Sequence, residues 1–262
     1  MAWHTSPGVA RQNRCAWRGA ALVAALAATL FAAAPAHAQT SGDGFLFKAP
    51  TGIVTFRTGF DRASAGSDLF AFTTDQLTVN RKDFSAITLA GDVSFHVSQR
   101  MDGVVGFAYS GSTIPSEFRN WVDNNRRPIE QTTTFQRVPL TGSVKAYLTE
   151  PGRSVGHFAW IPARYAAYVG AGGGAMWYRF AQAGDFIDFA TTKVFADSFD
   201  SNGWTPTAHA FGGVDVSLNP RFAVTTEGRY EWARAKLGRD FSGFDSIDLS
   251  GFTLTTGISI RY

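Results

Sequence analysis

Residues 249–262 read Leu249-Ser250-Gly251-Phe252-Thr253-Leu254-Thr255-Thr256-Gly257-Ile258-Ser259-Ile260-Arg261-Tyr262. The apolar Phe252, Leu254 and Ile258 alternate with threonine and serine, so an extended chain places them on one face. A period of two indicates a β-strand that has one apolar and one polar face. The last segment of the chain is therefore predicted to be a strand between two different surroundings.

Seven earlier segments alternate in the same way, which gives eight predicted strands. They span residues 52–62, 85–98, 103–112, 133–148, 165–180, 207–218 and 222–234. The segment 165–180 is apolar or glycine on both faces, so its sidedness stays open. The pattern predicts an all-β chain and suits either a soluble sandwich or a transmembrane barrel.

Strand length and connection length favour the barrel. The segments are long enough to span a bilayer, which takes about 9–11 tilted residues, whereas sandwich strands are shorter. Short connections at 99–102 and 219–221 alternate with long ones at 62–84, 112–132 and 181–205. We therefore predict a closed antiparallel up-and-down transmembrane β-barrel of eight strands with long outer loops. The long connection 149–164, on the side of the short turns, is an exception.

The beginning of the chain has the pattern of an export signal. Three arginines within residues 1–18 precede an uncharged Ala/Leu-rich run that ends at Ala36-His37-Ala38. A basic start, an apolar middle and a small-x-small end are typical of a cleaved signal peptide. We expect a signal peptide at 1–38 and a barrel domain at 39–262.

Composition excludes several classes of protein. With 17% charged and 14% aromatic residues, the chain is unlike a disordered one, and its single cysteine excludes a disulfide framework. Removal of the signal takes away three arginines and no acid, which leaves 21 basic and 21 acidic residues. The isoelectric point of 9.1 therefore does not indicate a nucleic-acid partner.

The end of the chain carries the most specific resemblance. Thr255, Gly257, Ile260 and Tyr262 resemble the outer-membrane insertion signal, although that signal usually ends in phenylalanine. With the glycine-rich stretch 168–174 and the turn 218–221, the chain resembles small OmpA-like outer-membrane β-barrel proteins of Gram-negative bacteria. The resemblance implies passage with periplasmic chaperones to the barrel-assembly machinery, which reads the last strand.

The expected inward face carries charges of both signs. The interior of an eight-stranded barrel is just wide enough to be filled by side chains. An unpaired charge there is costly, so we expect salt bridges that plug the lumen. The alternative is a narrow ion path lined by Glu227, Arg229 and Glu231. The charges expected inside are Arg57, Asp61, Asp92, Lys145, Asp215, Glu227, Arg229, Glu231 and Arg261.

A catalytic reading rests on one pair of residues. His96 and Ser98 resemble the His-x-Ser of outer-membrane lipid A deacylases, but they lie near a short turn without an evident acidic partner. The sequence therefore predicts no enzymatic activity, no cofactor and no metal site.

Two loops and the aromatic residues suggest further features. Residues 67–72 are expected to form a short helix, capped by Ser67, over the barrel mouth. Arg119, Arg126 and Arg127 are expected to contact lipopolysaccharide phosphates, with solvated loop charges as the alternative. Aromatic residues near the strand ends, among them Tyr178, Phe180 and Trp232, are expected to form interfacial girdles.

The sequence thus predicts a monomeric integral outer-membrane protein with a structural or cell-surface interaction role. Its expected surroundings are outer-membrane lipid and lipopolysaccharide. A narrow passive channel for ions or small solutes is the first alternative, and a lipid A-modifying hydrolase is the second.

Overall fold

The computed structural model describes residues 44–123, 125–156, 158–188 and 191–262. The predicted signal peptide and its cleavage site therefore lie outside the described residues. Within them, no helix is both long and apolar enough to cross a membrane.

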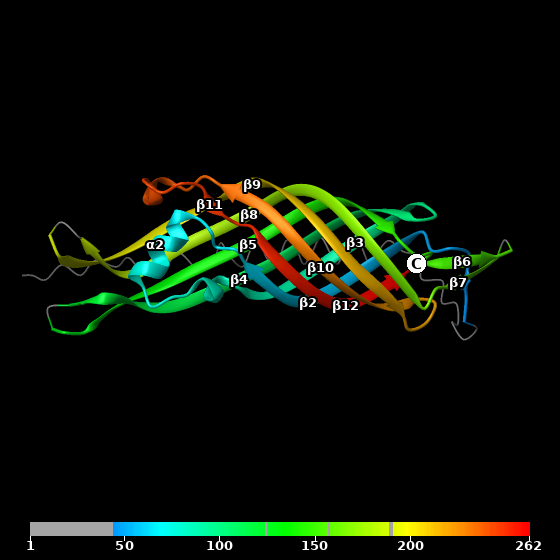
Figure 1. Ribbon diagram of the computed structural model, residues 1–262, viewed down its shortest axis with the longest axis horizontal. Coiled ribbons are helices and arrows are strands. Elements are labelled where there is room, and N and C mark those ends of the chain that lie inside the picture. Colours follow the sequence, from blue (N-terminus) through cyan, green and yellow to red (C-terminus); the bar gives the residue numbers. More distant parts are fainter. Residues whose placement is uncertain (1–43, 124, 157, 189–190) are drawn as a thin grey trace, which may run out of the picture. The chain divides into compact units, whose positions relative to one another are not determined.

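Eight strands form one closed antiparallel ring (Figure 1). They are β2 (Gly52–Ala63), β3 (Ala86–Ser98), β4 (Met101–Val122), β5 (Pro128–Tyr147), β8 (Tyr165–Asp188), β9 (Lys193–Ser217), β10 (Phe222–Ala235) and β12 (Gly251–Arg261). Each of these strands pairs with the next one along the chain, and β12 pairs with β2 to close the ring. The predicted closed up-and-down barrel of eight strands is confirmed.

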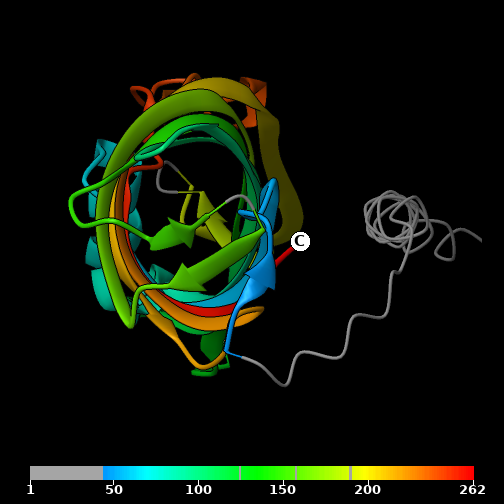
Figure 2. The same ribbon diagram turned by 90° about the vertical axis from the view of Figure 1, so that its right-hand side faces the viewer.

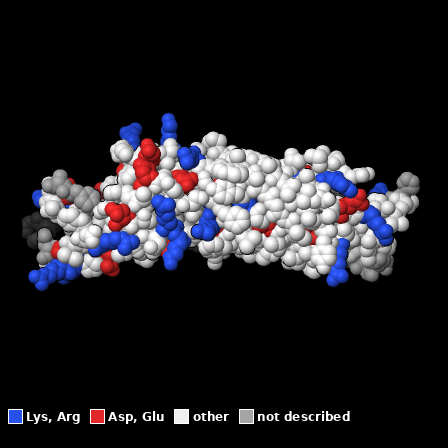
Figure 3. Space-filling view, viewed as in Figure 1, with Lys and Arg blue, Asp and Glu red and all other residues white. Residues whose placement is uncertain are grey.

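Alternation along the strands separates a polar interior from an apolar exterior. On β2, Arg57 and Asp61 are 8% and 6% exposed, whereas the neighbouring Phe56 and Phe60 are 44% and 54% exposed. On the face shown in Figure 3, the result is a broad band with few charges, flanked by charged residues toward both ends. A soluble sandwich would have the opposite arrangement.

The two ends of the barrel differ. One end, called here the short-turn end, carries the β3–β4 turn, the β9–β10 turn and Tyr262. The other end, called the long-loop end, carries the connections after β2, β4, β8 and β10. Long connections at one end and short ones at the other are the asymmetry of outer-membrane barrels.

Two of the predicted long loops are strand. β4, β5, β8 and β9 contain 22, 20, 24 and 25 residues, so most of the predicted loops 112–132 and 181–205 belongs to two long hairpins. The extensions are stable as strands because they pair with one another: β5 and β8 stay in register as far as Gln131 and Gly184. The sequence pattern missed them because their inward faces are partly apolar.

A small apolar domain, the cap, fills the mouth at the long-loop end. It comprises α2 (Asp68–Gln76), η1 (Arg81–Phe84), η2 (Arg239–Phe241) and β11 (Ile247–Asp248). The predicted helix over the mouth is confirmed, but its capping is not, because the Ser67 side chain makes no hydrogen bond to the helix.

Aromatic rings form the centre of the cap. Phe70 of α2 is fully buried, and its ring centroid lies 4.7 Å from Phe84, 5.3 Å from Phe135 and 5.7 Å from Phe180. Tyr178 and Phe180 are 2% and 0% exposed, so the prediction that they belong to the lipid-facing girdle was wrong. They point inward, where the strands have passed beyond the polar part of the lumen and pack against the cap.

A second, smaller sheet covers the short-turn end. β6 (Gly152–Val155) and β7 (Ala159–Pro162) form a hairpin, and β1 (Leu46–Phe47) pairs with β7. Figure 2 shows these strands across the barrel opening. The sheet, called here the lid, accounts for the unusual length of the connection 149–164.

Candidate functional site

The middle of the lumen holds a cluster of charged side chains from β2, β3 and β10, joined by a tyrosine of β8. Arg57 lies between two acids: its Nη2 is 2.6 Å from Asp92 Oδ2 and its Nη1 is 3.1 Å from Glu227 Oε2. Arg229 Nη2 is 3.0 Å from the other carboxylate oxygen of Glu227. The Tyr168 hydroxyl donates a hydrogen bond to Glu227 Oε2 at 3.1 Å. Such close pairing offsets the cost of removing these charges from water.

A second ion pair lies toward the short-turn end. Lys145 Nζ is 2.9 Å from Asp215 Oδ2, and Thr225 donates to the other oxygen, Oδ1, at 2.7 Å. The Lys145 ammonium also lies 3.7 Å from the ring centroid of Tyr168 and 4.7 Å from that of Tyr147. Cation–π contacts of this kind stabilise a desolvated ammonium group.

A third ion pair joins the lumen to the cap. Arg137 Nη2 is 2.6 Å from Asp61 Oδ2, and Arg137 Nη1 donates to the Leu249 carbonyl at 2.8 Å. Arg137 was missing from the sequence-based set of lumen residues. The inward residues of β5 are odd-numbered, so continuing the alternation from Thr141 back through Pro139 would have placed Arg137 inside the barrel.

Two of the expected lumen charges have no ion pair among the described residues. Glu231 accepts a hydrogen bond from Thr207 Oγ1 at 3.0 Å. Arg261 donates to Ser217 Oγ at 2.9 Å and to the carbonyls of Asn219 and Pro220 at 3.5 and 3.4 Å. For these two side chains, the expected salt bridges are replaced by hydrogen bonds to neutral groups.

The glycine-rich strand β8 brings β5 and β9 side chains together. Gly172 faces inward, and a Cβ at this position would clash with the Gly142 carbonyl and Ser143. Across that glycine, Ser143 Oγ lies 2.8 Å from His209 Nε2. The sequence left open which face of 165–180 points inward. The structure places glycines such as Gly172 on the inward face, where the absence of a side chain leaves room for those of β5 and β9.

Little free volume remains in the middle of the lumen, whereas its short-turn end is roomier. A cavity of about 40 Å³ borders Arg57, Asp92, Glu227 and Arg229, which is room for only a few water molecules. A cavity of about 380 Å³ lies under the lid at the short-turn end. Tyr147, which lines the larger cavity, packs against Tyr168, which is hydrogen-bonded to Glu227 in the central cluster.

The His96–Ser98 pair is separated by an irregularity in β3. His96 lies opposite Asp102, and its Nδ1 is 2.9 Å from Asp102 Oδ1, so an acidic partner exists that the sequence did not reveal. A register shift follows His96 and places Ser98 opposite Met101. Met101 and Asp102 are neighbours on β4, so their side chains point to opposite faces of the wall. The shift takes the serine out of the face that holds His96 and Asp102.

Ser143 and His209 form a second serine–histidine pair in the lumen, with Ser143 Oγ 2.8 Å from His209 Nε2, but the other ring nitrogen of His209 has no hydrogen-bond partner among the described residues. No set of three or more His, Cys, Asp or Glu side chains there is placed to hold a metal ion.

The residues of the predicted insertion signal occupy the β10–β12–β2 seam. Thr255 is buried and its hydroxyl donates to the Glu227 carbonyl at 3.4 Å. Gly257 faces inward where a Cβ would clash with the Phe56 carbonyl. Ile260 pairs with Val54, and the Tyr262 carbonyl accepts a hydrogen bond from Thr51 N at 2.8 Å. These residues therefore also help to close the barrel.

The three arginines of the β4–β5 hairpin have different surroundings. Arg119 donates to the carbonyls of Thr74 and Val79 at 3.3 and 3.2 Å, and so fastens the cap to β4. Arg126 and Arg127 are exposed in the turn between β4 and β5. The structure therefore does not bring the three guanidinium groups together as one phosphate site.

Comparisons with known proteins give matches among solved structures. No family model and no curated protein matches the chain. Neisserial surface protein A matches with 9% identity over 84% of this chain and 98% of its own, at a TM-score of 0.42. The outer-membrane protein OprG of Pseudomonas aeruginosa matches with 11% identity over 83% and 98%, also at 0.42.

A protease barrel is also among the matches. OmpT of Escherichia coli matches with 11% identity over 83% of this chain and 98% of its own, at a TM-score of 0.31. Such low similarity says nothing about function, which must be inferred from the residues of this chain.

Proposed function

We propose that this chain is an integral outer-membrane β-barrel protein that acts through its exposed surface and does not conduct solutes. The observation that carries the proposal is the filled lumen. Arg57, Asp92, Glu227 and Arg229 occupy its middle, the cap fills one mouth and the lid covers the other. A continuous water path has no room in such an interior.

The outer surface of the barrel supports the membrane location. Ile87, Val105 and Leu254 are 73%, 62% and 54% exposed, and an apolar band of this extent is unfavourable in water. Lipid is therefore the proposed surrounding of the band. The short-turn end would face the periplasm and the long-loop end the exterior.

The two long hairpins are the proposed interaction surface. They continue the barrel wall beyond the band and expose apolar and basic side chains near their turns, among them Val122, Arg127 and Phe195. Arg126 and Arg127 remain proposed contacts for lipopolysaccharide phosphates, whereas Arg119 holds the cap. The last strand is the proposed signal for the barrel-assembly machinery, and we propose a monomer.

Single-channel recording tests the plugged lumen. Residues 39–262 are refolded, their folding is checked by heat-dependent gel mobility, and they are added to a planar bilayer. We expect no conductance from this protein, while a porin of known conductance serves as control. Stable, reproducible steps would contradict the proposal and favour the narrow channel.

A variant without the lid tests whether the lid or the central cluster closes the barrel. In it, residues 150–163 are replaced by a short Gly-Ser linker, which removes β6 and β7 and leaves the eight-stranded ring. We expect this variant to remain silent, because the central cluster is intact. Steps seen only in this variant would mean that the lid, and not the paired charges, closes the barrel.

A further inference from the structure

The outer wall of the barrel has a groove where β9 and β10 meet. The groove is shallow and wide open to the outside, has a volume of about 670 Å³, and is bordered by Pro206, Ala208, Tyr230 and Trp232. Its remaining lining residues are Thr207, Ala233, Arg234, Asp248 and Ser250. It is called here the β9–β10 groove, and it opens on the side of the wall that we propose faces lipid.

A proline in the middle of β9 explains why the wall is open there. Ser217 N donates to Arg164 next to β8, so the N–H groups of odd-numbered β9 residues point to β8 and those of even-numbered residues point to β10. Position 206 should therefore donate to β10 opposite Arg234, but proline has no N–H. The β9–β10 ladder stops one pair earlier, at Thr207 and Ala233.

A threonine hydroxyl takes over the carbonyl that the proline leaves without a partner: Thr205 Oγ1 donates to the Arg234 carbonyl at 2.5 Å. Thr207 Oγ1 adds a hydrogen bond to the Trp232 carbonyl at 3.1 Å, at the last paired positions of the ladder. The edge of the groove is thus satisfied without strand pairing, so the groove can stay open in an apolar medium.

The outward face of β10 changes from aromatic to cationic along the groove. Every second residue points outward, and the series reads Tyr230, Trp232, Arg234 and then Lys236 just after the strand. The rings of Tyr230 and Trp232 are 4.8 Å apart. Successive members are about 6–7 Å apart along a strand, so two cations follow directly on two interfacial rings.

The two cations are available to an external anion. Arg234 and Lys236 are exposed and form no ion pair within the described residues. The acid at the groove, Asp248, uses one carboxylate oxygen for Gly66 N at 3.1 Å and the other for Ser250 N at 3.0 Å. Both oxygens of Asp248 are thus held by backbone N–H groups, and no ion pair joins this carboxylate to Arg234 within the described residues.

We propose that the β9–β10 groove holds an acyl chain of a lipid A molecule whose phosphate binds Arg234 and Lys236. Apolar walls within the lipid-facing band select an acyl chain, and a guanidinium group binds a phosphate with two parallel hydrogen bonds. The cations lie toward the long-loop end, so the lipid belongs to the outer leaflet. This inference rests on the proposed outer-membrane location.

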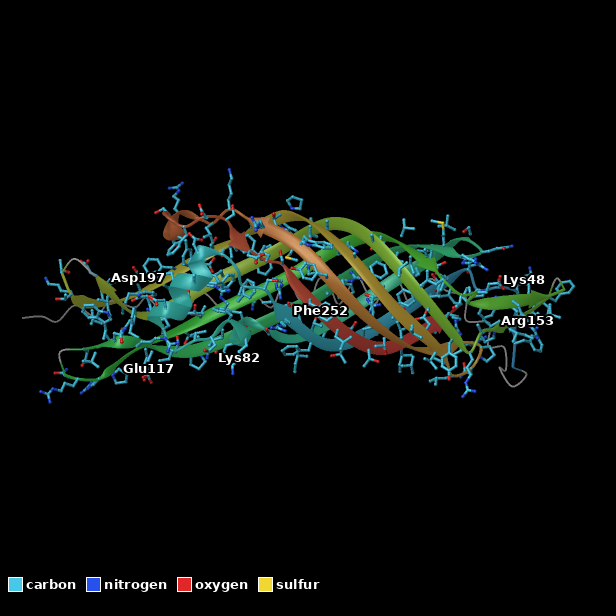
Figure 4. The ribbon with its side chains drawn as sticks, viewed as in Figure 1. Lys48, Lys82, Glu117, Arg153, Asp197 and Phe252 are labelled. Carbon is cyan, nitrogen blue, oxygen red and sulfur yellow. The ribbon has the colours of Figure 1, made fainter. Side chains whose placement is uncertain are left out.

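Binding of purified lipid A to the refolded protein tests the site. Residues 39–262 in detergent are titrated with bisphosphorylated lipid A, and retained lipid is counted by native mass spectrometry. We expect the R234Q/K236Q variant to bind at least about tenfold more weakly, since two charge-assisted contacts are lost. The control variant is K48Q/R153Q, which removes two exposed cations at the short-turn end (Figure 4) and should bind normally.

A second variant tests the groove without changing charge. P206V restores an N–H opposite Arg234, which allows the β9–β10 ladder to extend and narrows the groove. We expect weaker lipid A binding by this variant, with folding verified by heat-dependent gel mobility.

Several outcomes would overturn the proposal. The first is an equal loss of lipid A affinity in the R234Q/K236Q and control variants. The second is unchanged lipid A binding by P206V. The third is binding of phosphatidylglycerol as tight as that of lipid A by the unchanged protein. Failure of lipid A to bind a folded barrel would reject this site, while the membrane orientation is tested separately by the cysteine labelling described below.

Discussion

A charged residue in the lumen contributes to stability mainly because its removal would leave an oppositely charged partner buried and unpaired. Arg57 is 8% exposed and holds both Asp92 and Glu227. Its pairing stabilises the barrel less by attraction than by preventing the buried Asp92 carboxylate from standing without a cation, whereas Glu227 would keep Arg229. Arg62, on the outside of the same strand, has no ion pair within the described part of the chain.

The substitution Arg57→Gln is therefore expected to lower the free energy of unfolding by about 3–5 kcal/mol, as for other broken buried ion pairs. Urea unfolding in lipid vesicles measures the difference. Arg62→Gln removes the same charge from the surface and should change the stability by less than about 0.5 kcal/mol. Equal stability of the two variants would show that the lumen pairs contribute nothing.

At the scale of elements, one strand can face two different interiors. The inward face of β8 has glycines in the polar part of the lumen, and then Met176, Tyr178 and Phe180 under the cap. The helix α2 packs on that apolar stretch with Phe70 and Leu69, which are buried, while Phe72 is 43% exposed. The cap is thus a separate apolar core on top of a polar barrel.

The substitution Phe70→Ala should loosen the cap and leave the barrel intact. Phenylalanine-to-alanine changes in a core cost about 3–5 kcal/mol, and that loss should fall on residues 64–85. Hydrogen exchange followed by mass spectrometry should show faster exchange there and unchanged exchange in the spanning strands. Phe72→Ala is the matched control: its half-exposed ring contacts Phe244 at 5.4 Å but lies outside the buried cluster around Phe70, so exchange in the cap should change much less. Equal acceleration in both variants would contradict this packing.

The whole molecule has two unlike ends separated by the apolar band, and this arrangement predicts its orientation in a membrane. Figure 4 marks Asp197 at the long-loop end and Arg153 at the short-turn end. The chain has one cysteine, Cys15, which lies in the predicted signal peptide. An introduced cysteine would therefore be the only thiol of the mature protein if that segment is removed.

Intact cells should label Asp197→Cys with a membrane-impermeant maleimide. Ser154→Cys, in the lid, should react only after the outer membrane has been permeabilised, because it is expected on the periplasmic side. The reverse pattern would overturn the orientation, and labelling of both variants in intact cells would argue against an outer-membrane barrel.

The period of two determined the class of fold, the number of strands and the inward position of residues such as Asp92 and Glu227. This information is local, because alternate side chains of any strand point to opposite sides. The same local rule assigned Ser98 to the face of His96, and it failed there because a register shift depends on the pairing with β4.

Tertiary structure alone decided which charges meet, where the lumen is apolar and where the wall is open. Arg57 meets Glu227 and Arg137 meets Asp61 across separations of 170 and 76 residues, and strand register sets both contacts. The lengths of β4, β5, β8 and β9 depend on their mutual pairing, and their inward aromatic residues depend on the cap. Alternation can tell which side a residue faces, whereas only closure of the ring determines what it faces.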